Sequence, residues 1–227
     1  MTVFNYDSEI ITRFPLVAGA VILGSGLHNG PTPADVLDLY RMEQKTVSEK
    51  IGSTPLSELP TLAGWRAAFR SFGVDPTGYR SAAEALLRRL TKKGDIPSIN
   101  TLVDLCNLIS IRYGLPVAAI DRKRINGTIT VRFARGDENF VNLNQAEADH
   151  PAAGEVIFTD EKDVVIARRW CWRQSEESAA REETTDVLIT IEAQNEGGRE
   201  LVKSAAADLR ELLKTHLGGD YTQTFLP

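Results

Sequence analysis

The spacing of apolar residues predicts helices in the first half of the chain and mostly strands in the second. In the early segments apolar positions recur three or four residues apart, which is the spacing of a half-buried helix. The ends carry matching signals, such as Thr32-Pro33 before one helix and a glycine after others. The predicted helices cover residues 33–50, 62–72, 81–90 and 100–113, and a last one covers 200–217.

The other apolar segments predict strands. The run Phe14–Leu23 and the short segment PVAAI before Asp121 have the length and composition of buried strands. Alternating apolar and polar residues predict further strands. These cover residues 128–133 and 184–195, and segments 150–160 and 163–174 flank a short turn as in a hairpin. The pattern predicts one α+β domain over residues 1–227, with N-terminal helices packed on a mostly antiparallel sheet.

The predicted helix at 100–113 carries a polar stripe on an otherwise apolar surface. Asn100, Asp104 and Asn107 are spaced i, i+4 and i+7, so they share one face. A helix that is apolar on most sides is normally buried, so these groups need hydrogen-bond partners or line a pocket. Two interpretations stay open: a structural network that ties the helix to a neighbouring loop, or the floor of a ligand pocket.

A second polar pattern combines arginines with one carboxylate. Arg80, Glu84 and Arg88 recur at every fourth position of a predicted helix. An exposed ladder of ion pairs is the favoured interpretation. The alternative is a pair of guanidinium groups, held by the carboxylate, that grips a phosphate or a ligand carboxylate. More positive charge follows at Arg89, Lys92 and Lys93, either as a solvated face or as a basic patch.

The segment RRWCWRQ is the third candidate for chemistry. If it continues as a strand, its residues alternate between two faces. One face then carries Arg168, Trp170 and Trp172, and the other carries Arg169, Cys171 and Arg173. Tryptophans beside arginines can stack on a nucleobase or another planar ligand. The competing interpretation is a core strand whose tryptophans fill the space between sheet and helices.

Composition narrows the function classes. A net charge of -5 argues against a DNA-coating protein, although it leaves room for a local basic patch. The two cysteines, Cys106 and Cys171, provide no disulfide framework and no metal-binding spacing. The sequence shows no secretion signal and no apolar run long enough to cross a membrane, so a cytoplasmic protein without a cofactor is expected.

Taken in order, several segments resemble one family. They are FRSFGVDPTGYRSAAEALLRRL, KGDIPSIN, LVDLCN, PVAAID, HPAAGEVIFTD and ARRWCWRQ. Together, over about residues 62–193, they resemble free-standing relatives of the B3/B4 domain of the bacterial phenylalanyl-tRNA synthetase beta subunit. The resemblance implies the α+β B3/B4 fold and a metal-independent editing activity that hydrolyses tRNA mischarged with tyrosine. No ATP-binding synthetase core is present, so ligation is not expected.

The resemblance also implies roles for individual residues. Asp104 or Glu84 would orient water or bind the amino group of the substrate, as the candidate catalytic residues. The candidate substrate-binding residues are Asn100, Asn107, Arg80, Trp170, Trp172, Arg173 and Glu155. Of these, the arginines would bind negative charge and a tryptophan would stack on the terminal adenine or the amino-acid side chain.

The expected partner is the 3′ end of a tRNA or a ligand resembling aminoacyl-adenosine, bound by a trans-acting deacylase. The editing-site histidine and glutamate of the synthetase are not placed in this sequence, and His28 and His150 are unaligned candidates. Two other functions remain open: a module that binds RNA or an amino acid without cleaving it, and a hydrolase of small amino-acid esters or amides. The acidic net charge slightly favours these two over the tRNA deacylase.

Overall fold

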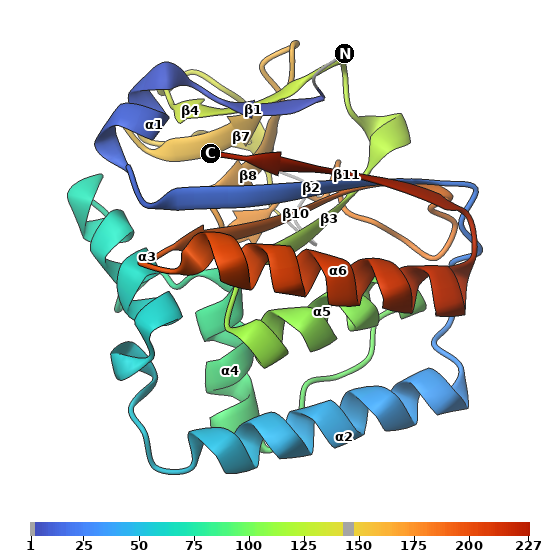
Figure 1. Ribbon diagram of the computed structural model, residues 1–227. Helices are drawn as coiled ribbons and strands as arrows, with labels where there is room; N and C mark the ends of the chain where they lie inside the picture. Colours follow the sequence, from blue (N-terminus) through green and yellow to red (C-terminus); the bar gives the residue numbers. More distant parts are fainter. Residues whose placement is uncertain (1–2, 143–147) are drawn as a thin grey trace.

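The protein stacks two β-sheets on one another and covers one of them with helices. This computed structural model describes residues 3–142 and 148–227 (Figure 1). We call the sheet that contacts the helices the inner sheet. The other sheet is the outer sheet. In Figure 1 the layers run from the outer sheet at the top, through the inner sheet, to α5 and α6 and finally α2.

The inner sheet is antiparallel throughout. Its strands lie in the order β11 (Asp220–Leu226), β2 (Val17–Ser25), β10 (Asp186–Gln194) and β3 (Val117–Asp121). Almost every residue of β2 and β10 is buried, because the helices cover one face of this sheet and the outer sheet covers the other. The apolar runs in the sequence therefore belong to strands that are buried on both faces.

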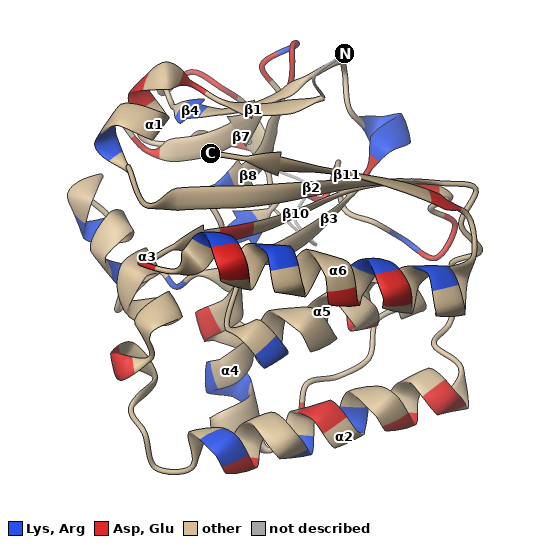
Figure 2. Cartoon of the chain, viewed as in Figure 1, with Lys and Arg blue, Asp and Glu red and all other residues tan. Residues whose placement is uncertain are grey.

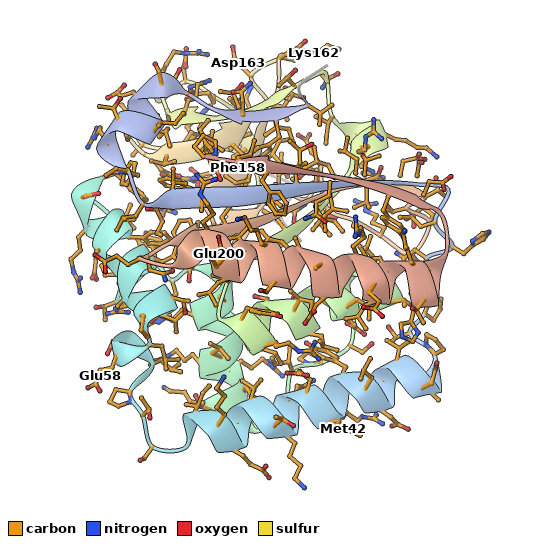
Figure 3. All side chains as sticks on the ribbon, in the orientation of Figure 1. Met42, Glu58, Phe158, Lys162, Asp163 and Glu200 are labelled. Atoms are coloured by element: carbon orange, nitrogen blue, oxygen red, sulfur yellow. The ribbon has the colours of Figure 1, made fainter. Side chains whose placement is uncertain are left out.

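The outer sheet has shorter strands than the inner sheet and contains both parallel and antiparallel pairs. Its order is β1 (Phe4–Tyr6), β4 (Ile129–Phe133), β7 (Val156–Thr159), β8 (Val165–Arg168) and β9 (Arg173–Gln174). Strands β1 and β4 are parallel and the other pairs are antiparallel. A separate pair joins β5 (Phe140–Val141) to β6 (Ala148–Asp149). An aromatic core fills the space between the two sheets, where Phe158 points into the interior (Figure 3).

The longer helices lie on the opposite side of the molecule from the outer sheet, whereas the short helix α1 lies beside β4 of the outer sheet (Figure 1). The helices are α1 (Ser8–Arg13), α2 (Ala34–Ile51), α3 (Pro60–Ser71), α4 (Ala82–Lys93), α5 (Thr101–Tyr113) and α6 (Gly198–Leu217), with short turns η1 (Leu56–Glu58) and η2 (Arg122–Arg124). Helix α6 packs on the inner sheet, α5 packs against α6, and α2 packs on α5. Met42 projects from the outer face of α2 (Figure 3). No described helix has the length and apolar character needed to cross a membrane.

The predicted α+β class and most of the predicted helices are confirmed. The Ser81 hydroxyl accepts a hydrogen bond from the Glu84 backbone N–H at 3.3 Å, and the Asn100 side chain caps α5 through the Val103 N–H at 3.0 Å. Gly114 ends α5 in the left-handed conformation that glycine adopts most readily.

The prediction of one continuous strand over residues 163–174 was wrong. Strand β8 ends at Arg168, and Arg169 and Trp170 have φ angles of 44° and 61°. Side chains with a Cβ rarely adopt such angles, so nothing in the local sequence signals this turn. Trp170 and Trp172 therefore do not share a strand face: Trp170 is fully buried, whereas Trp172 is partly exposed. Elements β1, α1, β5, β6 and β11 were not predicted.

Helix α3 crosses β10 at close range. A Cβ atom on Gly64 would overlap the Gln194 carbonyl oxygen and lie 2.8 Å from its carbon. Only glycine allows the backbones of α3 and β10 to come this close. The neighbouring Trp65 packs into the aromatic core between the two sheets.

We predict that Gly64→Ala destabilises the protein by about 2 kcal/mol, because forced overpacking outweighs alanine's better helix propensity. Urea unfolding monitored by tryptophan fluorescence measures this. Gly30→Ala is the control, since a Cβ there meets nothing within 4 Å in the described part of the chain. Equal stability of both variants would contradict the close approach.

Candidate functional site

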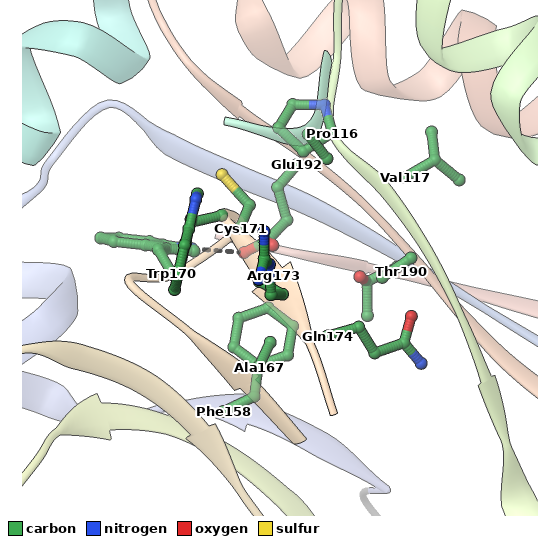
Figure 4. A pocket seen from close by; sticks show the side chains of 13 residues that line it. Pro116, Val117, Phe158, Ala167, Trp170, Cys171, Arg173, Gln174, Thr190 and Glu192 are labelled. Atoms are coloured by element: carbon green, nitrogen blue, oxygen red, sulfur yellow. Dashed lines mark hydrogen bonds between the residues drawn. The ribbon is translucent and has the colours of Figure 1, made fainter. Parts of the chain in front are cut away.

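A cavity of about 80 Å³ lies between the two sheets (Figure 4). The inner sheet contributes Val117, Thr190 and Glu192, and the outer sheet contributes Phe158 and Ala167. The turn after β8 and strand β9 complete the wall with residues 170–174. Because a water needs roughly 10–15 Å³ by this measure, the cavity accommodates a group of several non-hydrogen atoms but not a whole nucleotide.

Glu192 is the one carboxylic acid that lines this cavity in the described structure. Alternation along β10 sends Val187, Ile189 and Ile191 toward the helices, which leaves Thr190 and Glu192 on the face toward the outer sheet. Glu192 is only 2% exposed. An ionised carboxylate in such a place is unfavourable unless hydrogen bonds compensate for the lost water.

Two donors from distant segments hold Glu192. The Tyr6 hydroxyl donates to Oε1 at 2.7 Å, and the Trp170 indole N–H donates to the same oxygen at 2.9 Å. Neither of these donors uses Oε2, the second carboxyl oxygen. A ligand in the cavity could therefore bind to Oε2. Figure 4 shows the carboxyl beside the Trp170 indole and above the Phe158 ring.

Burial raises the pKa of Glu192 to about 7, although the hydrogen bonds from Trp170 and Tyr6 act in the opposite direction. Burial also raises the pKa of Tyr6 well above its usual range, and the neighbouring Glu192 adds to this effect. Near neutral pH the Glu192 carboxyl can therefore either accept or donate a hydrogen bond toward the cavity.

Trp170 is a core residue whose indole N–H makes a hydrogen bond. Its ring packs edge-to-face against Phe14 at 4.9 Å and Trp65 at 5.3 Å between ring centroids. Its backbone N–H donates to the Val156 carbonyl at 2.6 Å, which fixes the turn. Trp170 is thus a buried core residue, as the competing interpretation expected, but it lies in a turn and not in a strand, and its indole N–H orients Glu192.

Planar side chains stack beside the cavity. The Arg169 guanidinium lies 3.8 Å from the Tyr79 ring centroid and 4.4 Å from that of Trp172. The exposed Arg173 guanidinium lies 4.6 Å from the Trp172 ring, and both residues also line the cavity. This cluster, Tyr79, Arg169, Trp172 and Arg173, is a partly exposed platform that combines aromatic rings with guanidinium groups, the residue types on which planar groups stack.

Cys171 also lines the cavity, but its chemistry is that of a packed thiol. Burial and the nearby Glu192 raise the pKa of Cys171 well above its usual range. A thiol that keeps its proton is a weak nucleophile. The backbone carbonyl of Cys171 accepts a hydrogen bond from Ala82 N–H at 2.8 Å, so the turn is tied to the start of α4.

The polar stripe of α5 lies elsewhere. Asp104 is fully buried and accepts hydrogen bonds from the Thr32 hydroxyl at 2.7 Å, the Ile99 N–H at 2.9 Å and the Ser98 hydroxyl. These bonds tie α5 to the preceding loops. At 1.5 Å of rise per residue, Asp104 is roughly 13 Å from the end of α5 that approaches the cavity. Asn100 and Asn107 do not line the cavity either.

The remaining predicted residues also have partners outside the cavity. Glu155 is bound by Arg168, through Nε at 2.9 Å and Nη2 at 3.0 Å, within the outer sheet. His150 Nδ1 lies 2.8 Å from the Glu138 carbonyl oxygen, and His28 is not a lining residue. The structure thus brings Trp170, Trp172 and Arg173 together, and it places Glu155 and the α5 stripe apart from them. Catalytic roles for Asp104 and Glu84 stay predictions.

Arg80 and Glu84 line a different hollow, a cleft of about 420 Å³ beside α4. Glu84 accepts a hydrogen bond from Arg66 Nη1 at 2.7 Å, and Arg80 Nε lies 3.9 Å from the same carboxyl oxygen. In the described part of the chain, no cluster of His, Cys, Asp and Glu side chains is suited to hold a metal ion.

Sequence reasoning missed Glu192. The available signal was a carboxylate near the end of TTDVLITIEAQN, a strand apolar enough to be buried on both faces. A buried charge of this kind is more informative than an exposed one. What the sequence could not supply was the pairing of this residue with Tyr6 and Trp170, which lie far from it in sequence.

Comparison with known proteins relates this chain to one family. The family described as "B3/4 domain" matches residues 64–210. The phenylalanine–tRNA ligase beta subunit of Photorhabdus laumondii is 34% identical over 110 residues, which are 48% of this chain and 14% of that protein. The subunit of Mycolicibacterium paratuberculosis is 32% identical over 136 residues, which are 60% of this chain and 16% of that protein.

A solved structure shows the same fold. It is an N-terminal fragment of the phenylalanyl-tRNA synthetase beta-subunit from Pyrococcus horikoshii, with a TM-score of 0.54 and 13% identity. The similarity covers 100% of this chain and 54% of that fragment. The chain therefore spans only a small part of the curated relatives it matches, and about half of the solved fragment.

Burial of Glu192 makes stability depend on pH. Its pKa rises from 4.5 to about 7 on folding, so the folded state binds more protons than the unfolded state between these values. Stability contributed by the protonated carboxyl is therefore lost as pH rises through this window. Glu192→Gln keeps an oxygen acceptor for Tyr6 and Trp170 but does not titrate.

We predict that the free energy of unfolding of Glu192→Gln, taken relative to that of wild type, increases by up to about 3 kcal/mol as the pH is raised from about 5 to about 8. Urea unfolding at both pH values measures the difference. The exposed Glu196→Gln variant is the control and should show no such gain. A wild-type-to-Glu192→Gln difference that does not change with pH would contradict the shifted pKa.

Proposed function

Because this chain belongs to the B3/4 domain family, we propose that it binds the aminoacyl end of a tRNA and hydrolyses the ester of a mischarged amino acid. The relatives it matches are named as phenylalanine–tRNA ligase beta subunits, which supports a tRNA-related role. The observation that carries the proposal is Glu192 in the cavity between the sheets.

The cavity suits an amino-acid side chain with an apolar body and a polar end. Phe158, Ala167 and Val117 supply apolar walls, and Oε2 of Glu192 supplies the polar contact. Tyrosine, which the family resemblance implies, has this form. Because the pKa of Glu192 is about 7, its carboxyl can either donate a hydrogen bond to a ligand hydroxyl or accept one from it near neutral pH. An amino acid without a polar group would leave the carboxyl unpaired, which is unfavourable.

The terminal adenosine would lie outside the cavity, since the cavity is too small for a nucleotide. Trp172 and Arg173 line the cavity and also belong to the stacking platform, so they connect the two subsites. A nucleobase gains about 1–3 kcal/mol by stacking on an aromatic side chain. This platform favours a nucleotide-linked substrate over a small amino-acid ester.

Hydrolysis needs an oriented water and stabilisation of the oxyanion. Water attacks the ester carbonyl carbon, the bond to the ribose oxygen breaks, and the free amino acid and the tRNA hydroxyl are released. Arg173 is the one cationic side chain among the described lining residues, so it is our candidate for stabilising the developing negative charge. Binding without hydrolysis is the second candidate function, because the cavity and platform support binding equally well.

We predict that the protein deacylates one mischarged species from a panel of radiolabelled aminoacyl-tRNAs, and that Glu192→Gln lowers this rate at least about tenfold. The control Glu196→Gln should retain the wild-type rate. Asp104→Asn, which lies in the α5 network, should stay within about threefold if it is folded by circular dichroism.

Two other outcomes would each overturn part of this proposal. Loss of deacylation in Asp104→Asn but not in Glu192→Gln would move the active site to α5. Absence of deacylation for every species, with saturable binding of aminoacyl-tRNA that Glu192→Gln weakens, would establish a binding module and contradict the hydrolase.

A further inference from the structure

A basic cleft separate from the cavity lies on the other side of α4. It is bounded by α4, by the connector after α2 and by the loop that precedes α4, and it has a volume of about 420 Å³. Ala82, at the start of α4, lines the cavity between the sheets, whereas Glu84 and Arg88 line this cleft. The two hollows therefore share one helix but have different walls.

The cleft concentrates positive charge in an acidic protein. Its charged lining residues are Arg66, Arg80, Arg88, Lys92 and the single carboxylate Glu84. Four cations and one anion leave a formal excess of +3, while the whole chain carries -5. Figure 2 shows basic residues along α4 below the acidic position near its start. A concave surface lined by one sign of charge attracts ligands of the opposite sign.

Part of the cleft is rigidly built. Glu84 is 4% exposed and fixes Arg66, whose Nη1 also donates to the Pro76 carbonyl at 3.1 Å. The loop that carries Thr77 is held by Asp75, which accepts hydrogen bonds from Thr77 N–H at 2.9 Å and Gly78 N–H at 3.2 Å. Glu84 thus acts as a positioning residue for the basic wall.

The other cationic side chains of the cleft have N–H donors without a hydrogen-bond partner in the described structure. Arg80 Nε is buried and has no hydrogen-bond partner in the described structure, and its contact with Glu84 is a long one of 3.9 Å. Arg88 is half-buried and Lys92 is exposed, and neither side chain makes a hydrogen bond or ion pair with any described residue. Ser53 and Thr54, which carry hydroxyl groups, line the cleft from the connector after α2, whereas the hydroxyl of Thr91 in α4 already donates to the Leu87 carbonyl at 3.0 Å.

We propose that this cleft is a binding site for a phosphate group. Guanidinium groups match the oxygen geometry of phosphate, and hydroxyls and an ammonium add further donors. The phosphate can come from an RNA backbone or from a small phosphorylated compound. The site does not depend on the proposed deacylation, because none of its charged residues lines the cavity between the sheets.

Calorimetric titration with inorganic pyrophosphate tests the site. We expect saturable binding that weakens about tenfold in Arg88→Gln, the loss of roughly one charge-assisted contact, and that is partly restored in Arg88→Lys. Arg89→Gln is the matched control. Arg89 is the next residue on the same helix, but it pairs with Asp95 and lies outside the cleft. Glu192→Gln should bind pyrophosphate as wild type does.

The source of the phosphate follows from a second titration with a short single-stranded RNA. Weaker RNA binding by Arg88→Gln than by Arg89→Gln supports the site and identifies its ligand as a backbone phosphate. Equal RNA binding, with pyrophosphate binding still weakened, supports the site and identifies a small phosphorylated ligand. Absence of saturable pyrophosphate binding, or equal loss in Arg88→Gln and Arg89→Gln, would overturn the proposal.

Discussion

The two-residue alternation of β10 is the constraint on which the rest of the structure depends. This strand is buried on both faces, so every residue faces either the helices or the outer sheet. Ile189 and Ile191 pack with α5 and α6, and Thr190 and Glu192 face the outer sheet. Burying Glu192 is unfavourable on its own, and the donors from Tyr6 and Trp170 compensate for it. The same hydrogen bonds therefore connect β1, the turn after β8 and β10.

Much of the helical half could be predicted from the sequence, since its signals are local. Ser81, Asn100 and Gly114 cap helices in the way their residue types suggest. The strands were harder because their partners are distant in sequence. Strand β1 has only three residues, and it is stable only because it pairs with β4 and packs into the aromatic core. The left-handed turn at Arg169 and Trp170 follows from that core packing, not from residue propensity.

The candidate site was predicted only in part, for a similar reason. Helical spacing placed Asp104 on α5, whereas Asn100 is the N-cap residue that precedes the helix, and the spacing could not identify the loops that supply their partners. The segment RRWCWRQ was recognised as chemically unusual, and Trp170, Trp172 and Arg173 do line the cavity. Its geometry is that of a turn, so a buried tryptophan orients a carboxylate while a neighbouring one stacks with arginines. The site thus combines core packing with a partly exposed platform.

We propose that the cavity beside Glu192 receives the amino-acid part of an aminoacyl-adenosine. The most direct test is a titration with a non-hydrolysable analogue, in which an amide replaces the ester, followed by NMR of the tryptophan indole N–H signals. The chain has three tryptophans, so each signal can be assigned by substitution. We predict saturable shifts of the Trp170 and Trp172 signals, lost in Glu192→Gln. Unchanged Trp170 and Trp172 signals, with shifts in the backbone signals of residues 100–107, would contradict this account and favour a pocket at α5.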